Sequence, residues 1–114
     1  MIKVSILYPG SKETPFDMTY YLEQHMPLAL SLLGNHQGYR GVTVAQGLDM
    51  GNPELELRYI VICEFLFDSG QAFMEAFTPH ADTLEQDIAN YTTSKPMVQF
   101  SEVRMCHPAT ASHP

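Results

Sequence analysis

The sequence predicts one α+β domain in which helices cover a single face of an antiparallel sheet. Its 114 residues fit one domain and leave no room for a second. Apolar side chains alternate along short segments, as in strands, and recur with helical spacing along two longer stretches. Hydrophobic residues make up 45% of the chain, which is enough for a packed core.

The N-terminal part of the chain is predicted to form a strand and then a helix. Residues 2–8 alternate and are rich in β-branched side chains, and Pro9-Gly10 ends the strand. Asp17 is a typical N-cap, so the helix is expected to begin at Met18. Gly34 is a typical residue at the end of a helix.

Helical spacing predicts one buried stripe on this first helix. The stripe has positions i, i+3, i+4 and i+7, which are occupied by Met18, Tyr21, Leu22 and His25. Pro27 lacks a backbone N–H, so we expect the helix to bend or break just after His25. Such a bend would leave room between the helix and the sheet.

Two further strands are predicted on either side of a polar turn. They comprise residues 41–47 and 57–67, and the turn comprises residues 49–56. The later strand is apolar on both faces, which is expected when a sheet is covered on each side.

A second helix and a last strand complete the predicted fold. Asp68 and Gln71 fit a capping-box pattern at the start of the helix. Thr78-Pro79 restarts it, as a cap followed by a first-turn proline. The last strand is predicted for residues 97–105.

The predicted order β-α-β-β-α-β is the ferredoxin-like arrangement. It implies a four-stranded antiparallel sheet in the order 4-1-3-2, with both helices on one face. Because residues 57–67 are apolar on both faces, the face without helices also needs a cover. The sheet of a second copy would supply it, so we expect a homodimer with face-to-face sheets.

Charge and composition argue against several other classes of protein. Thirteen acidic and six scattered basic residues give a net charge of −7, which argues against nucleic-acid binding. No apolar run approaches the roughly 20 residues of a membrane span, and the N-terminus lacks a signal-peptide pattern, so a cytoplasmic protein is expected. Cys63 falls in a predicted strand and Cys106 lies at the end of the last one, which does not indicate a disulfide scaffold.

Several of these segments resemble the EthD family. Residues 1–9, 16–22 and 25–28 are similar to the opening of EthD-family proteins, and residues 65–69, 79–81 and 90–92 also resemble that family. The most specific part is the His-x-Pro-Leu element at residues 25–28 with its upstream tyrosines. The resemblance spans residues 2–103 and implies a dimeric α/β barrel. We therefore expect an EthD-like domain over residues 1–106 and a flexible C-terminal tail over residues 107–114.

The resemblance also suggests a function class. EthD-family members are tied to the breakdown of small organic compounds such as fuel ethers, often as accessory proteins. Some fungal relatives are similar to dehydratases or decarboxylases of aromatic polyketides, and relatives by fold include cofactor-free monooxygenases and muconolactone isomerases. Because a fold does not fix a function, these relatives set expectations only.

His25 is the main candidate site residue. It shares a helix face with Tyr21 and should point into the protein, where an unpaired imidazole would cost roughly 1–3 kcal/mol. With an ordinary pKa of about 6.5 it can act as a general acid or base. The alternative is a structural histidine that ties the helix to a strand or to backbone freed by Pro27. Tyr21 can line the same cavity or can be plain core, whereas Tyr20 points elsewhere on the helix.

The remaining polar residues give weaker signals. Gln99, Ser101 and Glu64 can reach a cavity between sheet and helices, or can lie at the dimer interface. His80 is expected to be a partly exposed residue at a helix end. No metal-binding spacing of His and Cys and no Gly-rich phosphate loop is present, so neither a metal nor a cofactor is predicted.

Two functional hypotheses follow from the sequence. The favoured one is a non-catalytic or accessory dimer that binds a small hydrophobic or aromatic compound in a catabolic pathway. The alternative is a cofactor-free enzyme that transfers protons, as a dehydratase, decarboxylase or isomerase, with His25 as acid or base and Tyr21 positioning the substrate.

Overall fold

The computed structural model describes residues 1–109 and contains the predicted four-stranded antiparallel sheet. The strands lie in the order β2-β3-β1-β4, which confirms the predicted order as counted from the other edge. Their bounds are β1 Ile2–Pro9, β2 Tyr39–Gln46, β3 Tyr59–Phe67 and β4 Met97–Glu102. The last strand is shorter than the predicted residues 97–105, and Cys106 beyond it is exposed.

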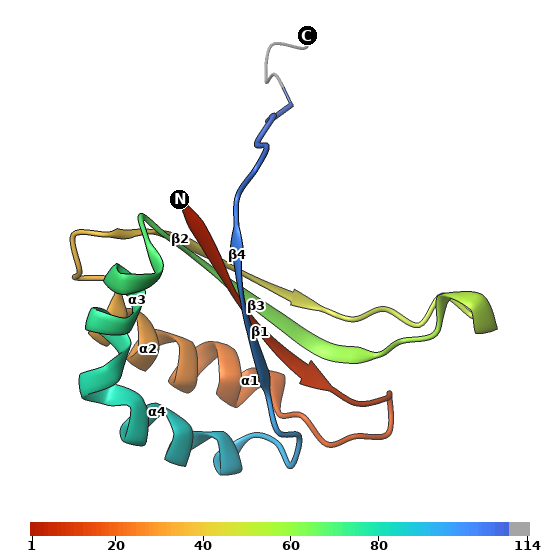
Figure 1. Cartoon of the computed structure of the whole chain (residues 1–114). Coiled ribbons are helices and arrows are strands. Elements are labelled where there is room, and N and C mark those ends of the chain that lie inside the picture. The colour runs from red at the N-terminus through yellow and green to blue at the C-terminus, as the bar shows by residue number, and fades with distance from the viewer. Residues whose placement is uncertain (110–114) are drawn as a thin grey trace, which may run out of the picture.

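The helices form two regions on the same face of the sheet (Figure 1), as the ferredoxin-like fold requires. The first region comprises α1 (Met18–Tyr20), a π-helical segment (Tyr21–His25) and α2 (Met26–Leu33). The second comprises α3 (Gly70–Phe77), α4 (Ala81–Asp87) and single 3-10 turns at Thr78–His80 and Ile88–Asn90. A further 3-10 turn, Pro53–Leu55, lies in the β2–β3 connection. No helix among residues 1–109 is long and apolar enough to cross a membrane.

Side chains that point from the sheet toward the helices form the core. Val4 of β1 pairs with Phe65 of β3, and both are at most 2% exposed. Tyr21 and Leu33 cover them from the first helical region and are equally buried. Since side chains alternate along a strand, this register also fixes which residues point away from the helices.

The face of the sheet without helices carries one apolar row and one polar row. The apolar row crosses all four strands and consists of Ala45, Ile62, Leu7 and Met97. The neighbouring polar row consists of Thr43, Glu64, Ser5 and Gln99. Of the two alternatives for Glu64, Gln99 and Ser101, the cavity under the helices is therefore ruled out, because all three lie on the uncovered face. Glu64 instead accepts a hydrogen bond from Ser5 at 3.0 Å on the uncovered face.

The first helical region contains a wider turn next to Pro27 and continues past it, so the predicted break does not occur. The backbone N–H of Met26 donates a hydrogen bond to the backbone carbonyl of Tyr21, five residues earlier. The π-helical turn therefore lies just before Pro27. A proline ring crowds the carbonyl four residues earlier, and a wider turn relieves that contact without ending the helix. The three segments follow one another as a continuous helix in Figure 1.

The extra residue in this turn also changes the buried stripe. Tyr21 and His25 are buried as predicted, but Leu22 is 49% exposed and does not belong to the stripe. Met26 is buried instead, because one additional residue per turn rotates the following side chains around the helix axis.

Of the three predicted helix caps, one agrees with the structure. Thr78 is not a cap, because it lies within a 3-10 turn and α4 follows His80, which forms no side-chain cap hydrogen bond. Asp17 accepts a hydrogen bond from the Tyr20 backbone N–H at 3.0 Å, as predicted. The second cap is Ser69, which accepts from Ala72 N–H at 3.0 Å, and not Asp68. Asp68 forms an ion pair with Arg40 at 2.8 Å instead.

The chain beyond β4 contains no helix or strand as far as Ala109. Residues 110–114 of the predicted tail lie outside the described residues.

Candidate functional site

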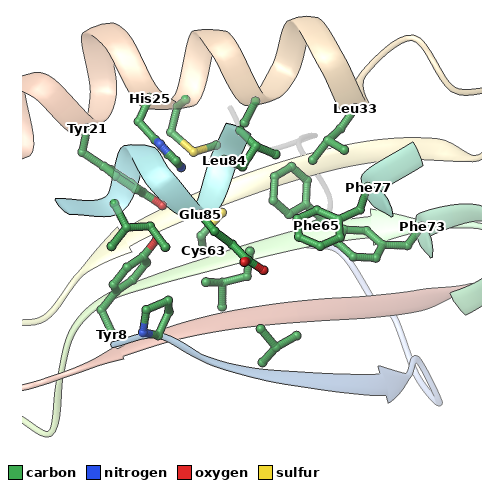
Figure 2. A pocket seen from close by; sticks show the side chains of 16 residues that line it. Tyr8, Tyr21, His25, Leu33, Cys63, Phe65, Phe73, Phe77, Leu84 and Glu85 are labelled. Atoms are coloured by element: carbon green, nitrogen blue, oxygen red, sulfur yellow. The ribbon is translucent and has the colours of Figure 1, made fainter. Parts of the chain in front are cut away.

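A cavity of about 310 Å³ lies between the helical regions and the sheet. Figure 2 shows that its two ends differ in chemistry. Tyr8, Tyr21 and His25 gather at one end, and three phenylalanines gather at the other. These are Phe65, Phe73 and Phe77, whose neighbouring rings lie 5.5–6.1 Å apart. The cavity is therefore apolar along most of its wall, with polar groups concentrated at one end.

His25 lies at the polar end and is only 7% exposed. Its Nδ1 is 2.8 Å from Oδ2 of Asp87, the last residue of α4. Both side chains are largely shielded from water, with 9% and 14% of their surfaces exposed. The π-helical turn of the first region and the end of the second region thus bring together residues that are 62 positions apart.

Asp87 is held by two further hydrogen bonds. Tyr20 donates its hydroxyl at 2.6 Å and Asn90 donates its side-chain amide at 2.9 Å. Burial alone would raise the pKa of the Asp87 carboxyl, but hydrogen bonds from Tyr20, Asn90 and His25 outweigh burial and lower this pKa. Asp87 is therefore ionised at neutral pH and acts only as a hydrogen-bond acceptor.

An ionised partner determines which nitrogen of a neutral His25 carries the hydrogen. Nδ1 must donate to Asp87, so Nε2 holds a lone pair. This arrangement, with a carboxylate on one side of the ring and a basic nitrogen that carries no hydrogen on the other, is the one a general base needs.

A chain of tyrosine hydroxyls leads from Nε2 of His25 to the cavity wall. The hydroxyl of Tyr91 lies 3.4 Å from Nε2 and 2.6 Å from the hydroxyl of Tyr8. Burial raises the pKa of Tyr8 to about 12 and raises the pKa of Tyr91 as well. Both phenols therefore stay protonated at neutral pH and can donate hydrogen bonds.

Tyr21 and Cys63 complete the polar end. Tyr21 stacks on His25 with ring centroids 5.4 Å apart and an interplanar angle of 14°. Burial raises the pKa of Tyr21, and it raises the pKa of the Cys63 thiol to about 11. Cys63 is thus a neutral thiol at neutral pH and lacks the activation that a nucleophilic cysteine needs.

The structure places both predicted site residues, His25 and Tyr21, at the cavity. Tyr20 points away from the cavity, as predicted, and its hydroxyl donates a hydrogen bond to Asp87. Sequence reasoning did not find Asp87, Tyr91 or Tyr8 as site residues. The likeness of residues 1–9 and 90–92 to the EthD family covered Tyr8 and Tyr91 without assigning them a role, and Asp87 had no signal because its pairing with His25 is a tertiary contact.

The other described histidines lie outside this site. His36 pairs with Glu75 at 3.1 Å in a more exposed position, and His80 is half-buried at the end of a 3-10 turn. Among residues 1–109, no group of three or more His, Cys, Asp or Glu side chains could hold a metal ion.

Fold and site together define a ferredoxin-like α+β protein with an apolar cavity and a buried histidine–carboxylate pair. The model of the EthD domain matches residues 12–95, and the chain belongs to the EthD family.

Solved structures agree with this assignment. An EthD-like protein from Ralstonia eutropha JMP134 is 35% identical, with a TM-score of 0.81 over 91% of this chain and 92% of that chain. An ethyl tert-butyl ether D (EthD) family protein from Bacillus halodurans C-125 is 20% identical, with a TM-score of 0.62 over 90% and 98% of the two chains. SnoaB, a cofactor-independent oxygenase from Streptomyces nogalater, shares the fold at 16% identity, with a TM-score of 0.55 over 95% of each chain. Among curated proteins, no significant match was found.

Proposed function

We propose that the cavity binds a small, mostly apolar molecule with one carbonyl or hydroxyl oxygen, and that His25 transfers a proton to or from it. The observation that carries this proposal is the pairing of His25 with Asp87 at the polar end of the cavity. It favours the enzymatic alternative over a purely accessory binding role, because binding an apolar ligand requires only the apolar wall. A largely shielded, ionised carboxylate beside a buried imidazole is costly and is typical of functional sites.

The proposed chemistry needs no cofactor. Nε2 of His25 removes a proton from a carbon next to the carbonyl of the ligand, and the C–H electron pair moves into an enolate. Tyr8 and Tyr21 are the protonated hydroxyls at that end, so they are the donors for the enolate oxygen. Asp87 stabilises the resulting imidazolium, which then returns the proton to the same carbon, to a neighbouring carbon or to a leaving group.

Hydrogen–deuterium exchange of 2-tetralone in D₂O, followed by proton NMR, tests this step. The wild-type protein should accelerate exchange of the C–H groups beside the carbonyl. His25→Asn should reduce this acceleration by at least about 100-fold, because it removes the base. His36→Asn is the matched control and should leave the rate unchanged, since His36 lies outside the cavity.

Each outcome separates the two hypotheses. Binding of 2-tetralone without faster exchange would favour the accessory function in a catabolic pathway over catalysis. Equal acceleration by the wild type and His25→Asn would contradict the role of His25.

We also propose that two copies pair through the uncovered face of the sheet. The apolar row of this face runs across all four strands, and its member Met97 is 53% exposed in a single chain. Light scattering at micromolar concentration should therefore give the mass of a dimer. Ile62→Lys, at the centre of this row, should give a folded monomer, whereas Glu23→Lys on the exposed side of the first helical region should remain a dimer. A monomeric wild type would contradict this assembly.

A further inference from the structure

Of the residues that the structure describes, Glu85 is the one charged residue, apart from the His25 site, that lines the cavity, and it is exposed to solvent. It belongs to α4, and Figure 2 shows its side chain reaching over the cavity toward the sheet between the polar and aromatic ends. Among residues 1–109, Glu85 has no ion pair and no side-chain hydrogen bond. Its negative charge is therefore available to any molecule that enters.

Among residues 1–109, no lysine or arginine lines the cavity. Within that part of the chain, His25 is the one lining group that can become cationic, and Asp87 at 2.8 Å then makes the pair neutral overall. The chain as a whole carries a net charge of −7, which adds to the negative potential.

We propose that Glu85 makes this cavity selective for uncharged ligands and excludes carboxylates. A carboxylate that enters loses the water around its charge along an apolar wall and meets a like charge. An uncharged phenol or ketone meets no like charge, and its desolvation costs much less. The inference rests on the proposed function, because it assumes that the ligand occupies this cavity.

The cavity also dictates how such a ligand lies. Its oxygen faces Tyr8, Tyr21 and His25, and its hydrocarbon part lies against the phenylalanines of the opposite end. At about 310 Å³ the cavity is at the small end of ligand pockets, which suits compounds on the order of one or two rings. The substrate class is therefore a compact, neutral hydroxy- or oxo-aromatic compound.

A matched pair of probes tests the selectivity, namely 2-naphthol and 2-naphthoate near neutral pH. They share one ring system and differ in charge, and their fluorescence can be followed without tryptophan background because the chain has no Trp. The wild type should bind 2-naphthol at least about tenfold more tightly than 2-naphthoate. Glu85→Gln should tighten 2-naphthoate binding by roughly threefold to tenfold and leave 2-naphthol within about twofold, and Glu85→Lys should strengthen naphthoate binding further.

Asp82→Asn is the control for overall charge. Asp82 lies on the same helix and is exposed outside the cavity, so this variant should leave the ratio of the two affinities within about twofold of the wild type. Equal affinity of the wild type for both probes would overturn the selectivity and leave the proposed function standing. If both Glu85 variants keep the wild-type ratio of the two affinities, the selectivity is overturned in the same way. Failure of both probes to bind would overturn the proposed function together with the selectivity.

Discussion

Two histidine–carboxylate pairs in this chain look alike in their short contacts and differ in everything around them. His25 and Asp87 are 2.8 Å apart with side chains 9% and 14% exposed, whereas His36 and Glu75 are 3.1 Å apart with side chains 27% and 56% exposed. Only the first pair lines the cavity, through His25, and only Asp87 receives a tyrosine hydroxyl in addition. Charged contacts gain strength where water is excluded, so similar distances do not mean similar roles.

The largest expected difference between the two pairs is in stability. Asp87→Ala leaves the Tyr20 hydroxyl and Nδ1 of His25 without their acceptor, which should lower the free energy of unfolding by about 1–3 kcal/mol. Glu75→Ala removes an exposed pair and should change it by no more than about 0.5 kcal/mol. Urea unfolding at equal protein concentration measures both values. Equal losses in the two variants would show that burial does not distinguish the pairs.

Acid gives a second test of the buried pair. Because the pKa of Asp87 is lowered in the folded protein, the unfolded chain binds its proton first as pH falls. The stabilisation is therefore complete above the unfolded pKa of about 3.9 and is lost as pH falls through the lowered value. The difference in unfolding free energy between wild type and Asp87→Asn should shrink as pH falls below about 4. A difference that persists unchanged to about pH 2 would contradict the lowered pKa.

Most of the fold could be predicted because its signals are local. Alternation, the Asp17 cap and Thr78-Pro79 each act within a few residues, and together they specify the order of strands and helices. The π-helical turn could not be predicted, because helical spacing assumes regular turns, and Leu22 was misplaced for that reason. The uncovered face was ambiguous as well, since the strand around Glu64 is apolar on both sides and its sequence does not show which side the helices cover.

The site was only half predictable for a related reason. His25 and Tyr21 share one helix face, which the sequence shows directly. Asp87 and Tyr91 meet His25 only after the second helical region packs beside the first, and no local pattern records a contact across more than 60 residues. A buried polar residue on a predicted stripe thus indicates that it has a hydrogen-bond partner, but not which residue that partner is.

The smallest expected difference between the two pairs is the position of a single hydrogen. Nδ1 of His25 faces the Asp87 carboxylate and must donate a hydrogen bond to it, so Nε2 carries no hydrogen. Nδ1 of His36 instead accepts a hydrogen bond from the Gly38 backbone N–H at 2.9 Å, so its hydrogen lies on Nε2 and is donated to Glu75. Long-range proton–nitrogen correlation NMR at about pH 8, where an ordinary imidazole is neutral, should therefore find opposite tautomers in the two rings. The spectra of the His25→Asn and His36→Asn variants assign the ring signals, because each variant lacks the signals of one imidazole. A His25 ring with its hydrogen on Nε2 would remove the free basic nitrogen on which proton transfer depends.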